Sequence, residues 1–177
     1  MRYDVVIIGG GHSGLEKGLE VLRQGLSCCA LCKGVSSRKF RDESYRHDVA
    51  REEFRSLGGV LFMGGIVTGG LISDGFLLSV HTEAHPEEPL EASRFYLSTG
   101  SFFTGGLSST ATKVFEPIFG LDVHFSGSHS DWVNPDFFAH QPFMDFGVLT
   151  DSEGHALLGG KPVQNLFPIG SILAGPK

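Results

Sequence analysis

The feature that most constrains this fold is a glycine-rich turn near the N-terminus. The apolar run Val5-Val6-Ile7-Ile8 passes directly into Gly9-Gly10-Gly11-His12-Ser13-Gly14. Three of these glycines have the spacing G-x-G-x-x-G, in which the first permits a tight turn, the second lets a phosphate approach the backbone, and the third lets the helix pack on the strand. The positive end of the helix dipole then faces the anion. The turn therefore predicts a nucleotide ligand.

Composition narrows the class of partner. The chain has 177 residues and a formal net charge of −6, which argues against nucleic acid as the main partner. No apolar run approaches the ~20 residues that cross a bilayer, and the N-terminus begins a strand rather than a signal peptide. Cys28, Cys29 and Cys32 lie too close together to staple a fold. We therefore expect a cytoplasmic location.

Hydrophobic periodicity predicts an α/β fold. Residues 3–8 and 26–32 are expected to be buried strands around a helix at 13–25. A second helix is expected at 43–57, with an apolar face made of Tyr45, Val49, Phe54 and Leu57. Further strands are expected at 60–67, 71–72, 76–82, 94–97 and 163–170. This order predicts a Rossmann-like FAD/NAD(P)-binding domain, with a parallel sheet and a small β-meander.

Residues 101–146 lack a regular period but are rich in aromatic side chains, namely Phe102, Phe103, Phe115, Phe119, Phe125, Trp132, Phe137, Phe138, Phe143 and Phe146. We expect a packed irregular segment or a subunit contact surface. The predicted organisation is one domain over 1–177. It comprises a βαβ start (1–34), a helix, meander and strand (43–100), the irregular aromatic segment (101–146) and a late strand (147–177).

Several longer motifs of the chain resemble those of a known protein family. Phe95-Tyr96-Leu97-Ser98-Thr99-Gly100 and Asn165-Leu166-Phe167-Pro168-Ile169-Gly170 look like two strand ends of two-dinucleotide-binding flavoproteins. The opening residues 1–11, the run 99–107 and Glu116-Pro117-Ile118-Phe119-Gly120-Leu121-Asp122-Val123 resemble the B subunits of the anaerobic glycerol-3-phosphate dehydrogenases, as do Trp132, Phe137-Phe138, Gln141-Pro142-Phe143 and Phe146-Gly147-Val148. The resemblance covers nearly the whole chain.

This resemblance implies a flavin cofactor, FMN or FAD. It also implies assembly with a catalytic A subunit and a membrane-anchoring iron–sulfur C subunit, which would hold the chain at the inner face of the membrane. The implied reaction oxidises glycerol 3-phosphate to dihydroxyacetone phosphate and sends electrons to quinone, with fumarate or nitrate as terminal acceptor. Members of this family are much longer, and their substrate-side domain falls where only residues 35–42 stand here. We therefore expect a shortened form that lacks the substrate domain.

The expected cofactor-binding residues follow from these motifs. They are Gly9, Gly10, Gly11, His12, Ser13, Gly14, Cys32, Lys33, Thr99, Gly100, Gly170 and Ser171. Cys32 takes the place of the carboxylate that usually binds the ribose, a change that disfavours NAD more than flavin. His12 is either a phosphate donor or a solvent-facing filler, and Ser171 either binds a phosphate or is a plain turn residue.

Neither a catalytic residue nor a metal site is predicted. His124, His129 and His140 include no position that spacing singles out as a general base, and Cys29 and Cys32 are expected to be structural on a buried strand. Three functions remain open: the flavin-binding dehydrogenase subunit, a non-catalytic assembly module, and a different flavin- or NAD-linked oxidoreductase.

Overall fold

A mixed β-sheet forms the centre of the protein in this computed structural model. The structure describes residues 1–34 and 41–176, with the backbone alone at 41–45. The sheet order is β3-β2-β1-β6-β5-β4, and β13 pairs with β6. Its strands are β1 (Arg2–Ile8), β2 (Cys28–Cys32), β3 (Val60–Met63), β4 (Val67–Ser73), β5 (Phe76–Thr82), β6 (Leu90–Leu97) and β13 (Leu166–Pro168). β3, β2, β1, β6 and β13 are parallel, whereas β4 and β5 are antiparallel. The predicted α/β class is confirmed.

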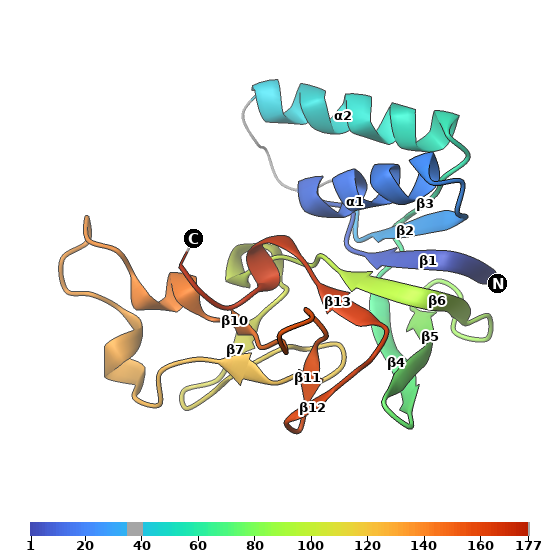
Figure 1. Cartoon of the computed structure of the whole chain (residues 1–177). Helices are drawn as coiled ribbons and strands as arrows, with labels where there is room; N and C mark the ends of the chain where they lie inside the picture. Colours follow the sequence, from blue (N-terminus) through green and yellow to red (C-terminus); the bar gives the residue numbers. More distant parts are fainter. Residues whose placement is uncertain (35–40, 177) are drawn as a thin grey trace.

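Two helices cover one face of this sheet, α1 (His12–Arg23) and α2 (Arg41–Ser56) (Figure 1). Alternation along β1 explains the two-sided core, because successive strand side chains point to opposite faces. Val5 and Ile7 pack in the helix-side cluster with Phe54 of α2, whereas Val6 and Ile8 belong to the cluster on the other face. A buried parallel strand of this kind is apolar on both sides.

Residues 101–176, apart from β13, pack on the face opposite the helices. Their 3₁₀ turns and short strands are η1 (Phe102–Thr104), β7 (Ser108–Ser109), β8 (Val114–Phe115), β9 (Val123–His124), η2 (His129–Trp132), η3 (Pro142–Asp145), β10 (Gly147–Val148), β11 (Leu157–Leu158), β12 (Lys161–Pro162) and η4 (Gly170–Ile172). Trp132 lies edge-on to Phe125 and Phe146, with ring centroids 6.2 and 5.9 Å away. Part of the aromatic segment is therefore core. Phe137 and Phe138, however, are 84% and 94% exposed.

Several predicted details were wrong. On α2 only Phe54 of the expected apolar face is buried; Val49 and Leu57 are exposed, and the side chain of Tyr45 lies outside the described residues. The strand expected at 60–67 is broken, because the chain turns at Gly64 (φ 76°) between β3 and β4. The strand expected at 94–97 begins at Leu90, and the late strand is limited to β13.

Candidate functional site

The candidate site lies at the carboxyl ends of the parallel strands. From β1 the chain passes through α1 to β2 on one side, whereas β6 pairs with β1 on the other. Such a reversal of strand order is the point at which open α/β sheets bind ligands. The turn at Gly9–Gly14 follows β1, Cys32 ends β2, Thr99 follows β6, and Gly170 follows β13.

Two glycines of the turn, Gly9 and Gly14, have a steric reason. Gly9 has φ 112°, and a Cβ built on it would lie 2.2 Å from the carbonyl oxygen of Ser98. A Cβ on Gly14 would lie 2.4 Å from the Gly9 carbonyl oxygen, so this glycine permits the close helix–strand packing. Gly11 differs, because a Cβ there would meet no atom within 4 Å. The turn is therefore tight around Gly9 and open at Gly11, where a ligand phosphate would need to approach.

The N-terminus of α1 is uncapped by side chains. Gly11 is the N-cap residue, with φ −76°, and no side chain hydrogen-bonds there. The amide of Leu15 donates to the Gly11 carbonyl (3.0 Å), so the preceding N–H groups of the first turn lack helical acceptors. The exposed His12 ring contacts Glu16 (3.1 Å) on the helix surface. Of its two predicted roles, this contact favours the solvent-facing filler.

The ends of β6 and β13 meet beside the turn. Gly100 has φ 80°, and its Cβ, if present, would lie 3.4 Å from Oγ of Ser171. A Cβ on Gly170, at φ 73°, would lie 2.7 Å from Oγ of Ser13. The described structure thus brings Ser13, Gly100, Gly170 and Ser171 together with the glycine turn, although they lie far apart in the sequence.

Thr99 carries an unsatisfied polar atom in this cluster. Its Oγ1 is buried and has no hydrogen-bond partner among the described residues. Its carbonyl accepts from the Thr104 hydroxyl (2.8 Å), which winds the loop 99–106 tightly. A buried hydroxyl without a partner is costly, so a ligand group that bonds it would be favoured.

Basic side chains surround the end of β2. Cys32 lies under the turn, because a Cβ on Gly10 would be 2.0 Å from its Sγ. Burial raises the pKa of the Cys32 thiol, and the nearby charges of Arg51 and Arg55 oppose that shift. Lys33 reaches across to the η1 loop, where its Nζ lies 3.6 Å from the Cβ position of Gly105. The edge is therefore positively charged where a ribose-binding carboxylate is usual.

Sequence reasoning missed one residue at the turn. Nε2 of His47, on α2, donates to the Gly10 carbonyl (2.8 Å), which fixes the turn from the helix side. Arg51 lies one helical turn further on, with a 14% exposed side chain. Its Nε is buried and unpartnered among the described residues. Residues 47, 51 and 54 lie on the inner face of α2. Two of the three are polar, so hydrophobic periodicity does not predict this face.

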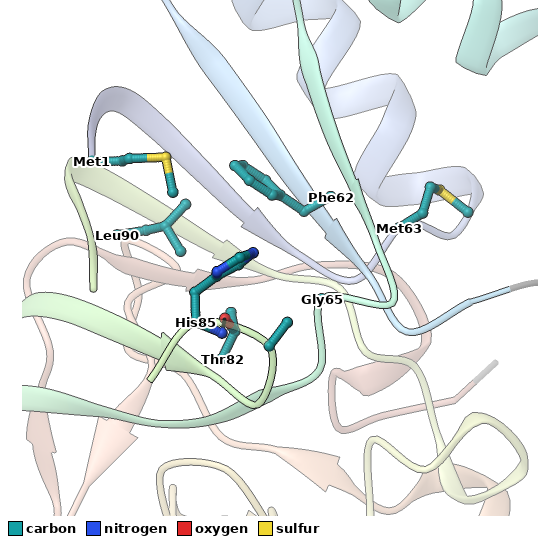
Figure 2. Close-up of a pocket in the computed structure, with 8 residues that line it drawn as sticks. Met1, Phe62, Met63, Gly65, Thr82, His85 and Leu90 are labelled. Atoms are coloured by element: carbon teal, nitrogen blue, oxygen red, sulfur yellow. Dashed lines mark hydrogen bonds between the residues drawn. The ribbon is translucent and has the colours of Figure 1, made fainter. Parts of the chain in front are cut away.

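His129 and His140 contact side chains outside the glycine turn. The His129 ring lies tilted against Trp132, with ring centroids 4.6 Å apart, and His140 hydrogen-bonds Asp145 (2.8 Å). No group of three metal-ligating side chains occurs in the described part of the chain. Figure 2 shows a hollow that includes Met1, at the start of β1. Gly9 follows the opposite end of that strand, so this hollow borders a different part of the sheet.

The glycine turn, the open space at Gly11 and the unsatisfied Thr99 hydroxyl fit a nucleotide with a diphosphate. In agreement, the family sequence profile described as FAD binding domain matches residues 39–176. The match covers more than half of the chain, which therefore belongs to the FAD-binding domain family. The cofactor of the class is FAD, the second of the two flavins expected from the sequence.

The chain is also similar to individual curated proteins of known name. The chain is 38% identical over 129 residues to the B subunit of anaerobic glycerol-3-phosphate dehydrogenase from Pectobacterium atrosepticum, a match of 73% of this chain and 30% of that protein. The corresponding B subunit from Vibrio vulnificus is 39% identical over 132 residues, with 72% and 30% covered. The chain thus spans less than a third of these relatives.

A solved structure supports the fold. OxyS anhydrotetracycline hydroxylase from Streptomyces rimosus aligns with a TM-score of 0.50 and 17% identity, covering 64% of this chain and 36% of that one. At this identity the likeness concerns the fold alone. Among the described residues no helix is both long and apolar enough to cross a membrane.

Proposed function

We propose that this chain binds FAD at the switch-point edge and acts as the flavin-binding part of an anaerobic-type glycerol-3-phosphate dehydrogenase. The observation that carries the proposal is the open Gly11 at the uncapped start of α1. Backbone N–H groups and the helix dipole together attract phosphate at such a position. The similarity to the B subunits supports the choice of reaction.

In this proposal the chain's residues hold the cofactor. Amides of residues 12–14 bind the diphosphate, Lys33 adds positive charge, and Thr99 offers its unsatisfied hydroxyl. His47 keeps the turn in place by bonding the Gly10 carbonyl. When bound, flavin supplies the two-electron acceptor chemistry by which glycerol 3-phosphate becomes dihydroxyacetone phosphate. We assign no side chain as catalytic acid or base.

The proposed setting is a complex. Electrons pass onward to quinone, and catalytic A and iron–sulfur C subunits hold the chain at the inner face of the membrane. The exposed Phe137 and Phe138 support a docking role, because large exposed apolar side chains in one place favour protein contact. The same observation favours the second candidate, a non-catalytic assembly module.

FAD binding tests the proposal at one residue. Gly11 has an ordinary φ and open space around it, so Gly11→Ala keeps the fold but places a methyl group where the phosphate must approach. We expect wild-type chain to bind FAD, and Gly11→Ala to bind it about tenfold more weakly by calorimetry. Gly127→Ala is the matched control, since Gly127 also has open space. Equal affinity in all three chains, or none in wild type, would overturn the proposal.

The reaction is tested in the assembled state. Wild-type chain mixed with A-type and C-type subunits should reduce a dye acceptor with glycerol 3-phosphate, faster than the partners alone. Co-purification without this gain would favour the assembly module. Activity with other 2-hydroxy compounds but not glycerol 3-phosphate would favour a different oxidoreductase.

A further inference from the structure

An aromatic hollow adjoins the nucleotide site. Its volume is about 320 Å³ including the open mouth, and it is lined by Ser101, Phe102, Phe103, Phe143 and Met144. Ser101 directly follows Gly100, which lies beside Ser171 at the ends of β6 and β13. The hollow therefore begins where the switch-point edge ends. Two segments form it, η1 from one side and η3 from the other.

The lining suits a planar apolar ring. Phe102 and Phe103 both lie edge-on to Phe143, with ring centroids 6.3 and 6.2 Å away. Phe103 is nevertheless 81% exposed, so most of its ring area contacts water. An aromatic ligand placed against it would bury that surface and gain ring contacts. Met144 adds a flexible, polarizable side chain that adapts to a ring.

The nearby charges indicate what else the ligand carries. Lys33 reaches the η1 loop near Gly105, and the uncapped start of α1 lies beside the end of β6, where a Cβ on Gly14 would be 3.2 Å from Cβ of Ser98. One ligand with a phosphate at the turn and a ring at the other end would use both regions. FAD has this layout, whereas a purely apolar ligand would leave the phosphate-binding region unused.

We propose that this hollow holds the isoalloxazine ring of FAD, with Phe103 and Phe143 as its principal contacts. The inference rests on the proposed function, because it needs the diphosphate at the glycine turn. It assigns ring-binding residues from the aromatic segment 101–146, a segment to which neither the sequence motifs nor the family match gives a cofactor contact.

The test compares FAD with ADP, which has the diphosphate but no flavin ring. Calorimetry measures both affinities for wild type and for Phe103→Ala, a change at an exposed residue that leaves the core intact. We expect FAD to bind about three- to tenfold more weakly and ADP to bind within about twofold of wild type. Phe143→Leu, which keeps an apolar side chain, should show the same selectivity with a smaller loss.

Phe138→Ala is the matched control, because Phe138 is 94% exposed and lies outside the hollow. It should leave both affinities unchanged. If wild type binds FAD but Phe103→Ala matches Phe138→Ala, the ring is elsewhere and this inference fails while the proposed function stands. Equal loss of FAD and ADP in Phe103→Ala would mean a general structural effect and would also overturn it. A wild-type chain that binds no FAD overturns both.

Discussion

Glu116 is a carboxyl group that the fold buries and satisfies with backbone amides. Its side chain is 1% exposed, and its oxygens accept from the amides of Ile118 (2.9 Å), Phe119 (2.7 Å) and Gly120 (3.1 Å). Burial raises the pKa of this carboxyl, whereas the amide hydrogen bonds lower it, and the net direction is upward. Glu116 thus closes the loop 116–120 at an electrostatic cost.

This raised pKa predicts a pH dependence. The ordinary value is 4.5, so the stability that Glu116 contributes is fully present below that pH and is lost as pH rises through the raised pKa. Glu116→Gln does not titrate. We expect the unfolding free energy of wild type, relative to Glu116→Gln, to fall as the pH rises above the ordinary value of 4.5, in urea titrations. Glu87→Gln, at an exposed loop position, is the control, and a pH-independent difference between wild type and Glu116→Gln would contradict the argument.

At the scale of elements, the side chain of Phe54 packs α2 against α1. Phe54 is fully buried, and a Cβ on Gly18 of α1 would lie 2.4 Å from its ring. A Cβ on Gly59, just before β3, would lie 2.3 Å from the same ring. Two glycines thus make room for one phenylalanine.

We therefore expect Phe54→Ala to destabilise the protein by about 3–5 kcal/mol, since it removes a buried ring and leaves a cavity between α1 and α2. Val49→Ala on the same helix should change stability by about 0.5 kcal/mol or less, because Val49 is 45% exposed. Chemical denaturation measures both. Similar losses in the two variants would mean that α2 packs through another face.

Elements differ in how far the sequence could predict them. The strand and helix around Gly9–Gly14 carry strong apolar periods and specific turn residues, and they were located within a few residues. The apolar face predicted for the second helix is wrong at Val49 and Leu57, because the inner face of α2 also contains His47 and Arg51. A polar residue on the inner face of a helix is explained by its partner in another element, here the Gly10 carbonyl that His47 contacts. The sequence of the helix itself does not indicate that partner.

The aromatic hollow shows the same limit for the candidate site. Its two sides come from η1 and η3, which are about forty residues apart in the chain. Sequence composition indicated that the aromatic residues of 101–146 would pack or form a contact surface. It could not indicate which of them meet, because that depends on long-range tertiary contacts rather than on spacing.

At the scale of the whole molecule, the labelling rate of the three cysteines measures how often the protein unfolds. Cys28 and Cys29 point to opposite faces of β2 and belong to the two different core clusters. Cys29 and Cys32, three residues apart on a strand, also point to opposite faces, so this C-x-x-C cannot close a disulfide without unfolding β2. All three thiols are free and buried.

Burial raises the pKa of Cys28 to about 12, and it raises the pKa of Cys29 and Cys32 as well. Because the thiolate is the reactive form, we expect the native chain to resist a thiol reagent at about pH 8, while the denatured chain reacts at three sites. Labelling then requires global opening. FAD at about 100 times its Kd should slow it about 100-fold in wild type, because the ligand binds only the folded state. Gly11→Ala should show much less protection at the same FAD concentration. Rapid labelling of any one cysteine in the native state would show that β2 opens locally, without unfolding of the whole sheet.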